Sequence, residues 1–206
     1  LMNHVKITNC YVNCDGPNNY GIKVRKRCTD LWVDNNYVKL SSSTTEPFNN
    51  IAIYDGCTAV NVRGNRCYNN NSGHSSIAFS PASHVICTGN YVEGSDDATS
   101  PEEEGGIEFE TKLVHVREGN GYTPEHCLLA DNIVKDCNWG IFTIQRPSTT
   151  SRLQHVQIRN NTLINCTVGV RLANTDNAHV GPNYYDNCTD NYDATDTTNI
   201  TLLQDS

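Results

Sequence analysis

Two short β-strand patterns recur along this chain at similar intervals, and this repetition constrains the fold more than any other feature. The first pattern is an alternating apolar run with asparagine three residues after its anchor. The six asparagines are Asn36, Asn65, Asn90, Asn132, Asn161 and Asn183, and Cys10 holds the equivalent first position. The steps between these positions are 26, 29, 25, 42, 29 and 22 residues.

The second pattern is a strand of the form Ile-x-apolar, in which valine sometimes replaces isoleucine. Its copies begin at Ile22, Ile51, Ile77, Ile107, Ile141, Val170 and Ile200, with steps of 29, 26, 30, 34, 29 and 30 residues. Two independent markers that advance together at this period are typical of a solenoid, in which each repeat stacks on the next.

The composition of each repeat favours strands, because short β-patterns alternate with turns rich in Asn, Asp and Gly and no helical period extends over 11 residues. A leucine-rich repeat lacks support, since its Leu-x-x-Leu-x-Leu register is missing, and a hexapeptide helix needs a shorter period. We expect an all-β right-handed parallel β-helix of about seven coils, with residues 1–206 as a single domain. Stacked asparagine amides would form a ladder, and asparagine also tolerates the left-handed backbone of a sharp corner.

The bulk properties exclude some functions. The net charge of −8 and pI near 5.2 disfavour a nucleic-acid partner, which calls for a basic stripe. No apolar run approaches the roughly 18 residues of a membrane span. No leader peptide is visible and the chain opens directly on a repeat, so we expect a fragment of a longer chain.

Ten cysteines raise the question of disulfides. Cys137, Cys166 and Cys188 each follow an apolar anchor by eight residues, and Cys28 and Cys57 each precede one by five. Such spacing predicts stacked cysteines that serve as small buried apolar side chains. Bridges between neighbouring coils are also within the permitted distance, so the redox compartment stays open.

The longest step, from Asn90 to Asn132, predicts a loop-decorated coil at about residues 84–125. Insertions in a solenoid often build its binding face. One inserted loop is acidic and contains Asp96, Asp97, Glu102, Glu103 and Glu104. Such oxygens suit Ca²⁺, but their spacing matches no calcium motif, so no metal or other cofactor is predicted.

The strand that follows the acidic loop carries the strongest candidate for chemistry. Ile107 and Phe109 take the inward phase, so Glu108 and Glu110 point outward together, with roots about 6.5–7 Å apart. This separation overlaps that of inverting glycosidases, in which one carboxyl group protonates the leaving oxygen and the other activates water. We therefore name Glu108 and Glu110 as candidate catalytic residues. Two glutamates on a solvent-facing strand without chemistry would give the same pattern.

The repeat phase also predicts what surrounds this pair. Small residues (Ala52, Ala78) lie on one side of Glu108, and Phe142 followed by Arg171 on the other. A small residue opens a groove, an aromatic ring stacks on a sugar, and a cation holds an acidic sugar. The candidate substrate-binding residues are Phe142, Arg171, Lys112, Trp139, Tyr54, His115 and Arg146.

The coils VQIRNNTLINCTVGVRL and LWVDNNYVKL resemble the right-handed parallel β-helix repeats of the pectate-lyase-like superfamily. This family includes pectinases, alginate-modifying enzymes and phage tailspike depolymerases. The resemblance implies a polysaccharide or cell-surface glycan as partner, an extracellular or virion-surface location and, as in phage spikes, a homotrimer. The Gly-His-Gly motif of polygalacturonases is missing, so no catalytic role is carried over from the family.

Three functions follow as expectations. The first is a tailspike-like polysaccharide depolymerase that hydrolyses its glycan through Glu108 and Glu110. The second is a non-catalytic β-helical spacer or adhesin segment, because stacking alone explains most of the sequence. The third is a polysaccharide lyase with His115 or Lys112 as the base. The histidines of the chain are scattered, and His4, His84 and His155 fit stacked turn positions better than a metal site.

Overall fold

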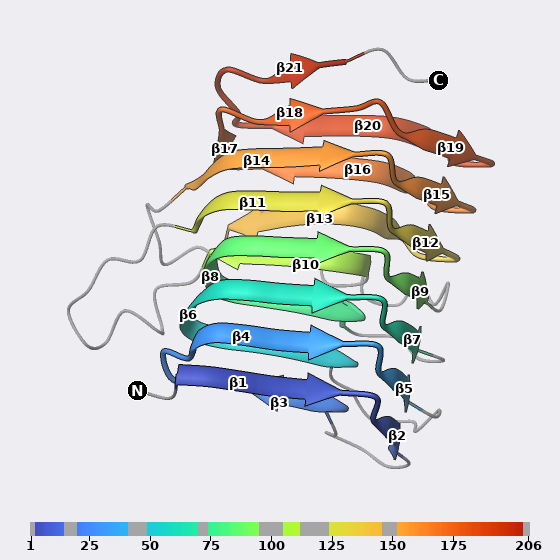
Figure 1. The fold of residues 1–206 in the computed structure, drawn as a ribbon. Helices are drawn as coiled ribbons and strands as arrows, with labels where there is room; N and C mark the ends of the chain where they lie inside the picture. The colour runs from blue at the N-terminus through green and yellow to red at the C-terminus, as the bar shows by residue number, and fades with distance from the viewer. Residues whose placement is uncertain are drawn as a thin grey trace.

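The computed structural model describes residues 3–14, 20–40, 49–69, 74–94, 105–111, 124–145 and 152–203, and the regular structure in these ranges consists of β-strands. Figure 1 shows the strands stacked along one axis, from β1 near the N-terminus to β21 near the C-terminus. They form a 14-stranded and a 7-stranded sheet, both parallel. No described segment forms a helix with the length and apolar character to span a membrane.

The larger sheet curls into two arms that share its longest strands, β6 (Ile51–Arg63) and β8 (Ile77–Thr88). The first arm continues from the start of these strands and holds β3 (Ile22–Val24), β10 (Gly105–Thr111), β13 (Trp139–Gln145), β16 (Val168–Ala173) and β20 (Asp190–Thr195). The second arm continues from their ends and holds β1 (Asn3–Thr8), β4 (Thr29–Asp34), β11 (Glu125–Ala130), β14 (Leu153–Arg159), β17 (Thr175–Asp176), β18 (His179–Val180) and β21 (Thr201–Leu202).

The smaller sheet contains one short strand from each repeat. Its members are β2 (Tyr11–Cys14), β5 (Tyr37–Leu40), β7 (Arg66–Asn69), β9 (Tyr91–Glu93), β12 (Ile133–Lys135), β15 (Thr162–Ile164) and β19 (Tyr184–Asp186). Each strand pairs with its counterparts in the adjacent repeats, with β2 and β19 at the two ends of the sheet, so backbone hydrogen bonds run between repeats. The predicted all-β, β-helix-like arrangement with parallel sheets is confirmed.

The predicted asparagine ladder is present. Each ladder asparagine from Asn36 to Asn161 donates from its backbone N and its Nδ2 to Oδ1 of the next one, at 2.9–3.1 Å. The Nδ2 group also donates to the carbonyl of the apolar anchor one repeat earlier, at 2.8–3.0 Å. Since these asparagines are buried, the ladder satisfies amide groups that would otherwise be costly.

The left-handed corner lies one residue before the ladder, and the ladder asparagines themselves are not left-handed. In six repeats the preceding residue is Asn9, Asn35, Gly64, Gly89, Asp131 or Asn160, with φ angles from 55° to 64°. In the last repeat the left-handed residue is Gly181, two residues before Asn183, with a φ angle of 99°. Asn, Asp and Gly are the residues that tolerate this region best. At Gly64 the contact is also close, because a Cβ there would lie 2.4 Å from Asn35 Oδ1.

The core is a column of inward side chains that includes the buried file Ile22, Ile51, Ile77, Ile107, Ile141 and Val170. Seven cysteines are buried with it: Cys28, Cys57, Cys67, Cys87, Cys127, Cys137 and Cys166. All ten cysteines are free thiols. Burial raises the pKa of Cys57, Cys127 and Cys166 to about 12. The predicted use of cysteine as a buried apolar residue is confirmed for Cys28, Cys57, Cys137 and Cys166, whereas Cys188 is only half-buried.

Candidate functional site

The two candidate carboxylates lie on β10, on the face opposite the core. Ile107 and Phe109 belong to the core cluster, and Glu108 and Glu110 alternate with them, as predicted. However, the glutamates do not face open solvent, because only 6% of Glu108 and 8% of Glu110 is exposed. Burial of a carboxylate is costly unless polar groups compensate it, so both glutamates require hydrogen-bond donors.

Serine hydroxyls supply two of these hydrogen bonds. Ser75 Oγ donates to Glu108 Oε2, and Ser80 Oγ donates to Glu110 Oε2, each at 2.6 Å. Both serines are buried. Ser80 lies in the predicted outward column, but its pairing with Glu110 was not predicted. Ser75 lies three residues before Ala78, the register partner of Glu108, and its hydrogen bond to Glu108 was not predicted.

The predicted order of residues along the stack is confirmed. Glu108 pairs in register with Ala78 on one side and Phe142 on the other. Ala78 continues to Ala52, and Phe142 continues to Arg171. The register thus places small side chains before the carboxylate and large ones after it.

Tyr54 comes from β6, which is separated from β10 by β8. It pairs in register with Ser80, and its hydroxyl donates to Asn49 Oδ1 at 2.6 Å. Burial raises the pKa of Tyr54, and the proximity of Tyr20, Glu108 and Glu110 raises it further. The phenol therefore keeps its proton at neutral pH and serves as a hydrogen-bond donor.

An aromatic cluster adjoins Glu108 on the other side. Trp139, Phe142 and Val168 pack together, with the Trp139 and Phe142 ring centroids 4.9 Å apart. The Arg171 guanidinium carbon lies 4.1 Å from the centroid of the Trp139 ring, and Arg171 Nε lies 3.4 Å from Asp193 Oδ2. Phe142 is fully buried, in contrast to the open sugar-stacking ring that the sequence suggested, and Trp139 is 8% exposed.

Several candidates lie outside the described residues. These are Lys112, His115 and Arg146 of the substrate-binding set, and the acidic loop residues Asp96, Asp97, Glu102, Glu103 and Glu104.

Two further hydroxyl oxygens, on residues next to Ser75 and Glu110 in the sequence, are buried. Ser76 Oγ follows Ser75, and Thr111 Oγ1 follows Glu110; neither has a hydrogen-bond partner in the part of the chain that the structure describes. Buried polar groups are normally paired, so hydroxyls of this kind mark a place where water or a ligand atom can bind.

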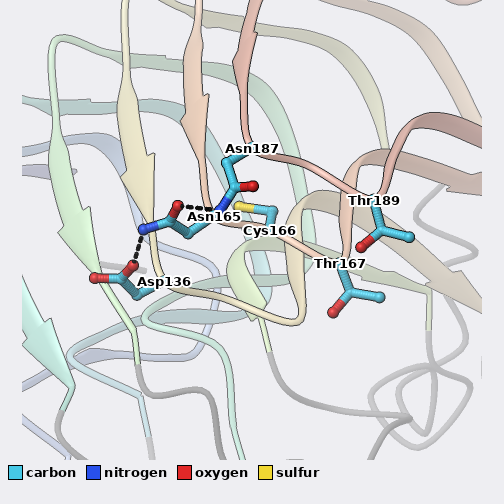
Figure 2. A pocket seen from close by; sticks show the side chains of 6 residues that line it. All are labelled: Asp136, Asn165, Cys166, Thr167, Asn187 and Thr189. Carbon is cyan, nitrogen blue, oxygen red and sulfur yellow. Dashed lines mark hydrogen bonds between the residues drawn. The ribbon is translucent and has the colours of Figure 1, made fainter.

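A second polar ladder lines a groove of about 420 Å³ where the smaller sheet turns toward the first arm (Figure 2). Asn165 Nδ2 donates to Asp136 Oδ1 at 2.8 Å, and Asn187 Nδ2 donates to Asn165 Oδ1 at 2.9 Å. Burial acts to raise the pKa of Asp136, but the hydrogen bonds from Asn165 and Lys135 outweigh it and lower the pKa. These residues are explained by stacking, and the groove does not reach the carboxylate pair.

No family model, no curated protein and no solved structure matches this chain.

Proposed function

We propose that this chain is a right-handed parallel β-helix of about seven coils, related to the pectate-lyase-like superfamily, and that it hydrolyses a polysaccharide. The observation that carries the proposal is the pair Glu108 and Glu110, two positions apart on one face of β10, buried and each hydrogen-bonded by a serine. Stacking does not require these carboxylates, since alanines occupy the equivalent positions beside Glu108.

The reaction follows the two-carboxyl scheme of glycoside hydrolysis. One glutamic acid gives its proton to the glycosidic oxygen as the bond from that oxygen to the anomeric carbon breaks. The other glutamate takes a proton from the water whose oxygen forms the new bond to that carbon. One water is consumed per bond cleaved, and a separation of about 6.5–7 Å along the strand leaves room for it.

Arg171 and Trp139 would hold the sugar in this proposal, with Phe142 packed behind Trp139. This role is supported by the stacking of the Arg171 guanidinium on the Trp139 indole. Trp139 lies on β13, the strand next to β10, and Arg171 lies on β16, the strand after that. Lys112, His115 and Arg146 remain candidate ligands of an acidic sugar. The substrate would be a cell-surface or extracellular glycan, which implies an extracellular or virion-surface location and, by analogy with phage spikes, a homotrimer.

The test is a polysaccharide-degradation screen with wild type, Glu108→Gln and Glu110→Gln. General acid–base catalysis contributes typically about 10²–10⁴-fold, so each substitution should lower activity by at least about 100-fold. Asp131→Asn is the matched control, because it removes one carboxylate at a left-handed corner where Asn35 and Asn160 stand in other repeats. Undiminished activity in both glutamine variants would remove the pair as the catalytic centre.

The lyase alternative is distinguished by its products. A lyase needs a base, and the raised pKa of Tyr54 makes this phenol a poor one, so His115 or Lys112 would have to serve. An unsaturated product in the same screen would indicate elimination, whereas hydrolysis gives a new reducing end without a double bond.

The non-catalytic spacer or adhesin is supported by the unbroken asparagine ladder, which accounts for much of the sequence without chemistry. A glycan array separates this alternative from the first. Binding without degradation in wild type, unchanged in both glutamine variants, would favour the spacer or adhesin.

A further inference from the structure

Three histidines form a stacked column on the second arm of the larger sheet. His84, His126 and His155 come from successive repeats, on β8, β11 and β14. The ring centroids of His84 and His126 are 5.2 Å apart, and those of His126 and His155 are 5.0 Å apart. All three side chains are exposed. His126 was not predicted in this column, although its 42-residue distance from His84 equals the step from Asn90 to Asn132 and could have revealed it.

The backbone of this column does not require imidazole. The three histidines have left-handed φ angles of 52° to 55°. In other repeats the equivalent position is also left-handed and is held by Asp30, Ala59, Asn177 and Asn199. Asn177 and Asn199 form a stacked amide pair there, with Nδ2 donating to Oδ1 at 3.1 Å. Asparagine therefore meets the conformational need, and the side-chain chemistry of the histidines calls for another explanation.

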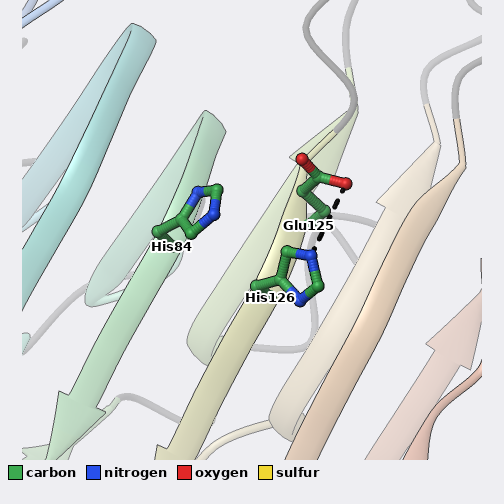
Figure 3. Close-up of side chains that lie close together, drawn as sticks. All are labelled: His84, Glu125 and His126. Carbon is green, nitrogen blue, oxygen red and sulfur yellow. Dashed lines mark ion pairs between the residues drawn. The ribbon is translucent and has the colours of Figure 1, made fainter.

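A carboxylate completes the group. Glu125 precedes His126 on β11, and its Oε2 lies 3.9 Å from His126 Nε2. One ligand atom from each of His84, Glu125 and His126 lies within 4.8 Å of the others. Figure 3 shows His84 and His126 side by side on neighbouring strands, with the Glu125 carboxylate beside the His126 ring.

We propose that His84, Glu125 and His126 bind one divalent transition-metal ion of the zinc class. Two imidazoles and one carboxylate suit Zn²⁺, Co²⁺, Ni²⁺ or Cu²⁺, whereas Ca²⁺ and Mg²⁺ prefer all-oxygen sites. Tetrahedral ligands at about 2.0–2.1 Å from zinc lie roughly 3.3 Å from one another. The three ligand atoms need to move inward by a small side-chain rotation, which their exposed or half-buried positions allow.

The site borders a groove of about 440 Å³ that is lined by His126, His155, Gln157 and His179, among others. Three protein ligands leave at least one coordination position open, as in catalytic zinc sites. That position would be filled by water or by a carboxylate or phosphate oxygen of a ligand in the groove. The proposal does not depend on the carboxylate pair of β10, which lies on the first arm.

The test is a titration of the full chain with Co²⁺, followed by displacement with Zn²⁺, monitored by visible absorption. One equivalent per chain is expected. Removal of a residue that only supports a metal ligand typically lowers metal affinity by roughly 10–100-fold. We expect a larger loss of Co²⁺ affinity for each of the three ligand variants, His84→Asn, His126→Asn and Glu125→Gln. These variants are matched to the fold, because Asn177 and Gln154 hold the equivalent positions in other repeats.

His155→Asn is the control, since it removes a stacked neighbour and leaves the three ligands in place. Wild-type affinity in this variant is expected. The proposal is overturned if His84→Asn and His126→Asn bind Co²⁺ like wild type, if His155→Asn loses as much affinity as they do, or if Ca²⁺ competes equally. A strong thiolate-to-cobalt absorption band would also overturn it, because the metal would then sit on cysteine.

Discussion

At the scale of single residues, the ladder asparagines have the largest structural role. Asn90 accepts from the backbone N and the Nδ2 of Asn65, and it donates to Val62 O and to Asn132 Oδ1. Its side chain thus joins three successive repeats inside a buried column. Unpaired buried donors and acceptors cost about 1–3 kcal/mol each, so a ladder position is sensitive to any loss of the amide.

We expect Asn90→Ala to lower the free energy of unfolding by about 3 kcal/mol or more, because the buried Asn65 backbone N–H and one hydrogen of its Nδ2 group lose their acceptor. Asn187→Gly is the control. It removes an exposed ladder amide while keeping a left-handed backbone, and it should cost less than about 1 kcal/mol. Urea denaturation of both variants measures the difference, and equal costs would contradict a special role for the buried ladder.

The residue scale also shows what the sequence can predict. Register follows from spacing, so the column through Ala78, Glu108, Phe142 and Arg171 was predicted in full. The burial of Glu108 and Glu110 was not predicted. Alternation along a strand shows on which side of the sheet a residue lies, but it does not show what covers that side. The Ser75 contact was missed for a related reason, because Ser75 lies two residues before β8 and the strand pattern does not tell where a side chain ahead of the strand points.

At the scale of elements, Arg152 connects two repeats just before β14. Its Nε donates to Asp176 Oδ2 at 2.8 Å, and its Nη1 donates to Asp196 Oδ2 at 3.1 Å. Burial acts to raise the pKa of Asp176, but hydrogen bonds from Arg152 and Thr198 outweigh it and lower the pKa. The planar guanidinium can reach both carboxylates at once, whereas a lysine ammonium cannot match that geometry.

We expect Arg152→Ala to lower the free energy of unfolding by about 1 kcal/mol, a small amount because solvent partly screens the exposed ion pair. Arg152→Lys should restore little of this loss. The folded pKa of Asp176 lies below its ordinary value of 3.8, so its contribution is present above that pH and is lost as the pH falls further. Urea denaturation at pH 7 and pH 3 should therefore show a smaller difference between wild type and variant at pH 3. A constant difference would contradict this linkage.

At the scale of the whole molecule, the buried thiols set the response to alkali. The pKa of Cys57, Cys127 and Cys166 is raised from 9.0 to about 12, and burial raises that of Cys67 and Cys87 as well. The unfolded chain loses these protons from about pH 9, whereas the folded chain retains them. The folded state then binds more protons, and its stability falls as the pH rises.

We expect the free energy of unfolding to be steady up to about pH 8.5 and then to decrease, by at most about 1.4 kcal/mol per pH unit for each buried thiol. Denaturation at intervals from pH 7 to pH 11 measures this slope. Cys127→Ala should make the slope shallower, whereas Cys10→Ser, at an exposed position, should leave it unchanged. Equal slopes in the two variants would contradict the assignment to buried cysteines.

The asparagine ladder has a practical consequence for protein engineering. The amide contact from Asn90 to Asn132 bridges 42 residues of chain and that from Asn161 to Asn183 bridges 22, yet both measure 3.0 Å. The length of chain between two ladder asparagines therefore does not alter their register. A foreign peptide inserted between Thr111 and Pro124 should leave the Asn90 and Asn132 contact in place. The molecule can serve as a display scaffold whose cargo varies in size while its frame stays fixed.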